Sequence, residues 1–157
     1  MNAASLGATE IARLTGLEYV TALAEGRALP PPMNDVIPFE LLRPVAGEVQ
    51  LRAIPEARFH NPMGIVHGGW LMTLLDSVMG LAGLTTLDPG EICPTHETAV
   101  KFFRPVTMGN GPVLLTGRVL SRGRNIIALE GRAESGDGKL HGHGTSTCVV
   151  VRQGGDR

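Results

Sequence analysis

The chain has 157 residues, enough for one domain with a hydrophobic core; 43% of them are apolar and 18% are charged. Its net charge of −1 gives no overall field to attract nucleic acid, so an anionic partner would need a local group of Arg or Lys. Only two cysteines, and a first segment without a basic start and apolar run, favour a cytoplasmic protein with reduced thiols over a secreted one.

An amphipathic helix is expected over residues 9–27, within an N-terminal segment that ends at residue 35. Thr15 and Glu18 have the spacing of a capping box, and Gly26 is placed to end the last turn. The proline-rich stretch 28–38 cannot be helical and is interpreted as a linker.

Strand-like sequence dominates the remainder of the chain. Residues 39–56 contain two strand-like pieces broken at Pro44–Gly47, which predicts a hairpin. Four further strands are expected after a turn, within residues 95–106, 111–122, 124–135 and 139–153.

Between the hairpin and these strands, an apolar helix is expected from about Gly68 to about Leu84. His67 and Asp76 make a membrane span costly here, so we interpret the segment as a buried helix of a protein without membrane spans. Apolar residues lie nearly all round this helix, so it needs cover on more than one side. A sheet that curls around the helix would supply this cover, and a second subunit could add to it.

The order of elements lacks the strand–helix alternation of doubly wound nucleotide-binding folds. It predicts an α+β fold, in which a six-stranded, mostly antiparallel and curved sheet wraps around one long central helix, with a short N-terminal helix added. We expect residues 36–152 to form this single domain and residues 153–157 to form a tail.

Two glycines, Gly68 and Gly69, stand where the long helix begins, and they let another group approach the backbone closely. The first N–H groups of a helix lack partners within it and can bind a carbonyl oxygen that gains negative charge in a transition state. The alternative is that the two glycines only permit a tight turn.

A carboxylate, Asp76, lies within this apolar helix, eight residues past Gly68 and hence about 12 Å further along the axis. Its side chain is too short to reach back to the start of its own helix. If both groups act on one bond, Asp76 must serve the helix start of a second subunit, which predicts a two-fold dimer with composite sites. The alternative is a structural Asp76 that is bonded to neighbouring backbone or hydroxyl groups.

The spacing of Asn61, His67, Gly68, Gly69 and Asp76 resembles the signature of hotdog-fold acyl-CoA thioesterases, specifically the phenylacetate-degradation (PaaI-like) branch. The stretches "PTHETAVKFFRPVTMGN" and "SRGRNIIALEGRAESGDGKLHGHGTSTCVV" are similar to a strand and to the final hairpin of that family. The resemblance covers roughly residues 36–152.

The resemblance implies a role for each of five residues. The N–H of Gly68 would polarise the thioester carbonyl, Asn61 would orient substrate or water, and His67 would shape the loop near the thioester sulfur. Asp76 of the neighbouring subunit would act as general base or nucleophile, and Thr95 would assist the attacking water. Dimers of this family commonly pair into tetramers, so the resemblance also implies a homotetramer built as a dimer of dimers.

Thioesters are already activated, so a base and an oxyanion donor are enough and we expect no metal or other cofactor, with coenzyme A as part of the substrate. Arg122 and Arg124 flank a turn, and their forked donors suit the phosphates of coenzyme A; solvated surface arginines are the alternative. His141 and His143 could form half a metal site, but no third ligand has useful spacing.

The predicted function is therefore hydrolysis of acyl-CoA to free acid and coenzyme A. A second possibility is a hotdog dehydratase or hydratase acting on acyl-thioesters. That chemistry requires a histidine–acid pair, and His67 is the only candidate histidine in a suitable place. A third is a non-catalytic acyl-CoA-binding module, which would not require Asp76.

Overall fold

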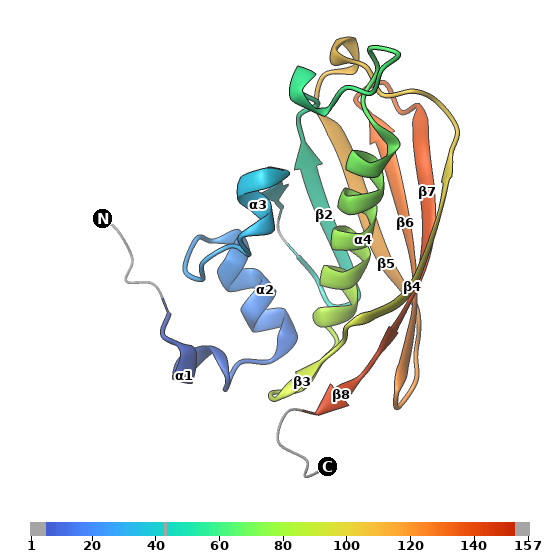
Figure 1. Cartoon of the computed structure of the whole chain (residues 1–157). Helices are drawn as coiled ribbons and strands as arrows, with labels where there is room; N and C mark the ends of the chain where they lie inside the picture. The colour runs from blue at the N-terminus through green and yellow to red at the C-terminus, as the bar shows by residue number, and fades with distance from the viewer. Residues whose placement is uncertain (1–5, 43, 153–157) are drawn as a thin grey trace.

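The fold is a curved antiparallel sheet around one long helix (Figure 1). The computed structural model describes residues 6–42 and 44–152. The six strands lie in the order β1-β2-β5-β6-β7-β4, and each neighbouring pair is antiparallel. Their bounds are β1 Glu40–Leu41, β2 Glu48–Ala53, β4 Thr95–Phe102, β5 Val113–Arg122, β6 Ile126–Ser135 and β7 Leu140–Val149. The α+β prediction is confirmed.

Smaller elements connect this framework. A separate two-stranded sheet pairs β3, Glu91–Ile92, with β8, Val151–Arg152. Two short 3-10 turns, Ala57–Phe59 and Met108–Asn110, lie in the loops.

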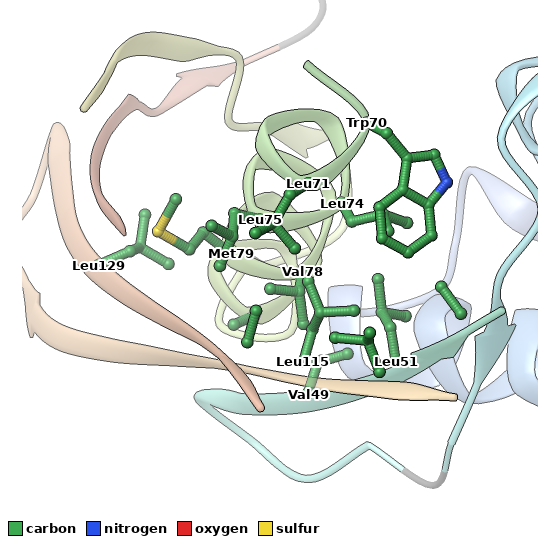
Figure 2. Packing of buried hydrophobic residues seen from close by; sticks show 14 of the residues in the cluster. Val49, Leu51, Trp70, Leu71, Leu74, Leu75, Val78, Met79, Leu115 and Leu129 are labelled. Atoms are coloured by element: carbon green, nitrogen blue, oxygen red, sulfur yellow. The ribbon is translucent and has the colours of Figure 1, made fainter. Parts of the chain in front are cut away.

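The long helix α4, Gly68–Leu84, packs in the concave face of the sheet and carries most of the core. In Figure 2, Met79 points towards Leu129 of β6, and Val78 points towards Leu115 and Val49. Leu71 and Leu75 lie against Gly142 of β7. Eight helix residues are buried, as the all-round apolar pattern predicts. The helix and β5 approach so closely that a Cβ on Gly117 would lie 2.3 Å from the Val78 carbonyl oxygen, so this position requires glycine.

The N-terminal helix differs from its prediction. Instead of one helix over residues 9–27, the structure has α1, Ala8–Ile11, and α2, Gly16–Ala24. Thr15 forms the predicted capping box, in which its N–H donates to Glu18 Oε2 at 2.8 Å and its hydroxyl accepts from the Glu18 N–H at 3.3 Å. The Thr15 N–H and the Thr15 hydroxyl both donate to Glu18 Oε2, and these two bonds lower the pKa of Glu18. An N-cap residue has an extended backbone, so the box at Thr15 begins a second helix and breaks the first.

The proline-rich linker also differs, because it contains a short helix, α3, Met33–Val36. Its first turn follows Pro32, where a missing N–H costs no helical hydrogen bond. The predicted hairpin is present as β1 paired with β2. The expected tail at 153–157 lies outside the described residues, and the domain boundary at residue 35 stays a prediction. In the parts of the chain that the structure describes, no helix has the length and apolarity to cross a bilayer.

Candidate active site

The start of α4 presents a backbone amide. His67 is the N-cap, and its Nδ1 accepts a hydrogen bond from the Gly69 N–H at 2.8 Å. Nδ1 is therefore unprotonated and the ring proton lies on Nε2. The Gly68 N–H has no acceptor among the described residues. Of the two predicted glycines, Gly68 is the one whose amide can bind a substrate oxygen, since His67 already uses the Gly69 amide.

A cavity of about 330 Å³ lies against this helix start, and we call it the tip cavity. Gly68, His67 and Asn61 all line it, together with Phe102 of β4. Asn61 Oδ1 accepts from the Met63 N–H at 2.9 Å, which shapes the loop, while the Asn61 amide NH₂ has no acceptor in the described part of the chain. Three predicted site residues thus line one cavity, and two of them carry a donor that has no acceptor among the described residues.

The predicted carboxylate, Asp76, is half-buried on α4 and is held by two threonines of β4. Its Oδ1 accepts from Thr98 Oγ1 at 2.8 Å and from Thr95 Oγ1 at 3.2 Å. The sequence analysis missed Thr98. Residues three apart point to opposite faces of a regular strand, but an irregularity between Thr95 and Glu97 shifts the register and brings both threonines to one face.

A second cavity, of about 560 Å³, lies on the flank of α4, and we call it the flank cavity. Asp76 and Thr95 line it, together with residues of α2, α3 and β1. Gly68 and Asp76 therefore belong to separate cavities within one chain. This placement agrees with the expectation that the two groups cannot meet along their own helix, which rises about 1.5 Å per residue.

The two cysteines lie near the threonine pair. Cys148 Sγ is 3.9 Å from Thr95 Oγ1. A hydrogen bond from Cys93 lowers the pKa of Cys148 to about 7, while the same contact and burial raise the pKa of Cys93. Both thiols are free.

His141, a candidate for half of a metal site, is bonded at both ring nitrogens. One bond joins it to the Pro105 carbonyl at 3.1 Å and the other to Ser135 Oγ at 3.0 Å, which is a structural role.

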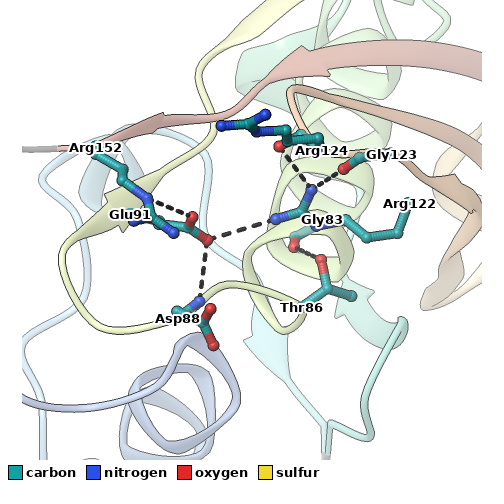
Figure 3. Close-up of polar contacts among 8 residues, drawn as sticks. All are labelled: Gly83, Thr86, Asp88, Glu91, Arg122, Gly123, Arg124 and Arg152. Atoms are coloured by element: carbon teal, nitrogen blue, oxygen red, sulfur yellow. Dashed lines mark hydrogen bonds and ion pairs between the residues drawn. The ribbon is translucent and has the colours of Figure 1, made fainter.

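The predicted phosphate-binding arginines lie beside the C-terminal end of α4, away from Gly68 (Figure 3). The Arg122 guanidinium is engaged by Glu91 at 3.4 Å and by the Arg124 carbonyl at 3.3 Å. Glu91 also accepts from Arg152 at 3.3 Å, and only 7% of its side chain is exposed. The Arg124 guanidinium has no hydrogen-bond partner among the described residues and lines a hollow of about 240 Å³. The structure thus separates a structural Arg122 from an available Arg124.

The segment that carries the start of α4, Asp76 and β4 matches a known protein family. A family model described as the thioesterase superfamily matches residues 63–141, which is half of the chain. The chain belongs to the thioesterase superfamily. This match runs from the loop before α4 into β7, so it includes Gly68, Asp76 and both threonines of the thioesterase chain.

Two curated relatives of this thioesterase-superfamily chain are archaeal. A protein of Saccharolobus solfataricus, named as a candidate esterase, is 34% identical over 89 residues, covering 57% of this chain and 61% of its own length. One of Thermoplasma acidophilum with the same description is 25% identical over 118 residues, covering 74% and 86%. The matched part therefore spans less than two thirds of the Saccharolobus relative.

Solved structures agree with the predicted fold and branch. A phenylacetic acid degradation-related protein of Ralstonia eutropha, named as a candidate thioesterase, has a TM-score of 0.77 and 30% identity, covering 84% of this chain and 99% of its own. A protein of Streptococcus mutans bound to acetyl-CoA has a TM-score of 0.67 at 22% identity, covering 73% and 90%, which shows the fold alone. The resemblance to hotdog-fold thioesterases of the phenylacetate-degradation branch is confirmed.

Proposed function

We propose that this protein hydrolyses acyl-CoA thioesters to a free acid and coenzyme A. The observation that carries the proposal is the pair of reactive groups on α4: an amide without an acceptor at Gly68, and a carboxylate at Asp76 held by two hydroxyls. Membership of the thioesterase superfamily and the names of the relatives support this reaction class.

The two groups would meet across a dimer. Strand β4 forms one edge of the sheet, and most of its eight residues are exposed. An unpaired edge strand of this length is a template for pairing with another chain. One end of β4 holds Thr95 beside Asp76, and the other end holds Phe102 against Gly68, where an added Cβ would lie 3.2 Å from the ring.

Pairing of β4 with its own copy would bring these two ends together. Antiparallel pairing centred on the strand would set Phe102 opposite the partner's Thr95. Gly68 of one protomer would then lie close to the partner's Asp76, and two-fold symmetry would create two such sites. The composite site and the dimer thus share one geometric origin.

Within such a site, the thioester oxygen would accept a hydrogen bond from the Gly68 N–H. The partner's Asp76 would take a proton from water as the water oxygen bonds to the carbonyl carbon, and the Gly68 amide would stabilise the oxyanion that forms. When the carbon–sulfur bond breaks, the sulfur would leave as a thiolate and take the proton that Asp76 received from water, which gives the free acid and the thiol of coenzyme A. Asn61 would orient the substrate through its amide, and His67 Nε2–H would lie near the sulfur.

Coenzyme A is the proposed leaving group because Arg124 offers a guanidinium that no described carboxylate neutralises. The Streptococcus mutans protein of the same fold binds acetyl-CoA, which supports the same class of ligand here.

The test is a thiol-release assay over a panel of acyl-CoAs, with the wild type beside Asp76→Asn. Asparagine keeps an oxygen that can accept from Thr95 and Thr98 but cannot take a proton, so we expect turnover to fall by about 10²–10⁴-fold with an unchanged melting temperature. Tight binding of acyl-CoA without release of thiol by the wild type would instead favour a binding module. Hydration of an enoyl-CoA would favour a hydratase.

A further inference from the structure

The flank cavity has one polar end and a long apolar body. Among the described residues that line it, Asp76 is the only one with a charge. The apolar walls come from both sides of the cavity, and they include Tyr19, Leu23, Met33, Phe39, Leu81 and Leu84. Two polar groups further along are bonded: Ser77 Oγ donates to the Thr73 carbonyl at 2.8 Å, and Asn34 Oδ1 accepts from the Phe39 N–H at 3.0 Å. The Tyr19 hydroxyl and the Asn34 amide NH₂ have no partner among the described residues, but neither carries a charge. The cavity body therefore offers hydrocarbon contacts.

The α4 wall of the cavity follows a single stripe of the helix. Asp76, Gly80 and Leu84 are spaced four residues apart, so their side-chain positions stack along one face over about 12 Å. Gly80 leaves a gap in the middle of this stripe, and a Cβ built there would meet no atom within 4 Å. A glycine inside a helix lowers stability relative to alanine, and no close contact at Gly80 accounts for it.

The opposite wall is fixed in place by α2. The Gly16 N–H donates to the Leu87 carbonyl at 2.9 Å, and Gly16 lies so close to α4 that an added Cβ would be 1.7 Å from the Leu84 carbonyl oxygen. Val20 and Ala22 of α2 are fully buried. This contact holds α2 against the end of α4 where Leu84 lines the cavity, so the α2 wall keeps its place beside the stripe from Asp76 to Leu84.

We propose that the flank cavity holds the acyl group of the substrate and that Gly80 determines which acyl groups fit. The occupant is a linear aliphatic acyl group longer than acetyl, with its carbonyl at Asp76 and its chain running past Gly80 towards Leu84. This inference rests on the proposed hydrolysis and adds the substrate class and a specificity-determining residue. The N-terminal segment is then part of the substrate site, since α2 and α3 form one of its walls.

The test compares kcat/KM for acetyl-, butanoyl-, octanoyl- and dodecanoyl-CoA in the wild type, Gly80→Ala and Gly80→Leu. In the wild type, kcat/KM should rise about fourfold per added methylene until the cavity is full, which corresponds to about 0.8 kcal/mol per buried CH₂. Gly80→Leu should lower the ratio of octanoyl to acetyl kcat/KM at least about tenfold, and Gly80→Ala should lower it less.

Gly83→Ala is the matched control. It is the same change in the same helix, but its Cβ would face the sheet, 3.4 Å from Leu129 Cδ2, and should leave the selectivity unchanged. Both alanine variants should melt no lower than the wild type, because alanine favours the helix. An unchanged octanoyl-to-acetyl ratio in Gly80→Leu, or a change of oligomeric state caused by Gly80→Ala, would overturn the proposal.

The two proposals fail in different ways. If the wild type releases thiol from acyl-CoAs with a flat dependence on chain length, hydrolysis stands and the acyl cavity is wrong. If no thioester is hydrolysed, the proposed function fails. The affinity for octanoyl-CoA, measured by calorimetry, then still tests the cavity. Gly80→Leu should bind octanoyl-CoA at least about tenfold more weakly than Gly83→Ala does.

Discussion

Thr98 Oγ1 donates a 2.8 Å hydrogen bond to Asp76 Oδ1, and this bond fixes the carboxylate against β4. Thr95 adds a longer bond of 3.2 Å to the same oxygen. The second carboxylate oxygen, Oδ2, has no hydrogen-bond partner among the described residues, so it is the atom available to a water or a substrate. Thr98 is therefore a positioning residue in the proposed reaction.

Replacing Thr98 by Val removes the shorter bond while keeping a β-branched side chain in the strand. We expect kcat to fall about 10- to 150-fold with little change in KM, because the loss of one hydrogen bond to a charged group corresponds to about 1.5–3 kcal/mol. Thr98→Ser retains the hydroxyl and should recover most of the turnover. Equal activity of the Val and Ser variants in steady-state kinetics would exclude this positioning role.

Gly68→Pro tests the amide directly, since proline lacks an N–H and suits the first position of a helix. The variant should lose about 10²–10³-fold in kcat, the range for removal of one oxyanion donor. Gly68→Ala is the control, because it adds a Cβ near the Phe102 ring but keeps the N–H. If both variants lose activity equally, crowding at Phe102 rather than the missing donor explains the loss.

Gly117→Ala tests the contact between α4 and the sheet. Its Cβ would lie 2.3 Å from the Val78 carbonyl oxygen, so the helix must move, and we expect a loss of at least about 1–3 kcal/mol in the free energy of unfolding. Gly136→Ala, at a turn where a Cβ would meet nothing within 4 Å, serves as the control. Urea denaturation of both variants measures the difference, and similar midpoints would contradict the close approach.

The two arginines should separate into different roles. Arg124→Gln should raise the KM for acyl-CoA about tenfold, the loss of one charge-assisted bond, without changing stability. Arg122→Gln should instead lower the free energy of unfolding by about 1–3 kcal/mol, since it takes a partner from the buried Glu91. Kinetics and denaturation of both variants distinguish the roles, and a higher KM only for Arg122→Gln would reverse the assignment.

Sequence periodicity predicted the fold because β2, β5 and β6 largely alternate buried and more exposed residues, and because α4 is apolar nearly all round. The capping box at Thr15 was also visible, but a box inside a longer amphipathic pattern marks the start of a second helix rather than support for one long helix. The contact of Thr98 with Asp76 was not predicted, because the irregularity in β4 breaks the two-residue alternation on which such predictions depend. The pairing of Arg122 with Glu91 joins residues 31 apart in the chain, and no local pattern encodes that contact.

The spacing of Gly68 and Asp76 along one helix predicted that a single chain cannot bring them together, and their separate cavities agree. The cavity beside Gly80 was not predictable, because its walls come from α2, α3 and β1, which lie far from α4 in the sequence. Propensity patterns describe single elements, whereas a cavity depends on how several of them dock.

The central claim is that each site combines Gly68 of one protomer with the partner's Asp76, and subunit mixing tests it most directly. Gly68→Pro and Asp76→Asn chains are unfolded together in equal amounts and refolded, and mixed dimers are verified by mass spectrometry. A mixed dimer holds one intact site of two, so the refolded mixture should regain about one quarter of wild-type activity. Activity that stays at the level of the two inactive parents, despite verified mixed dimers, would contradict the composite site.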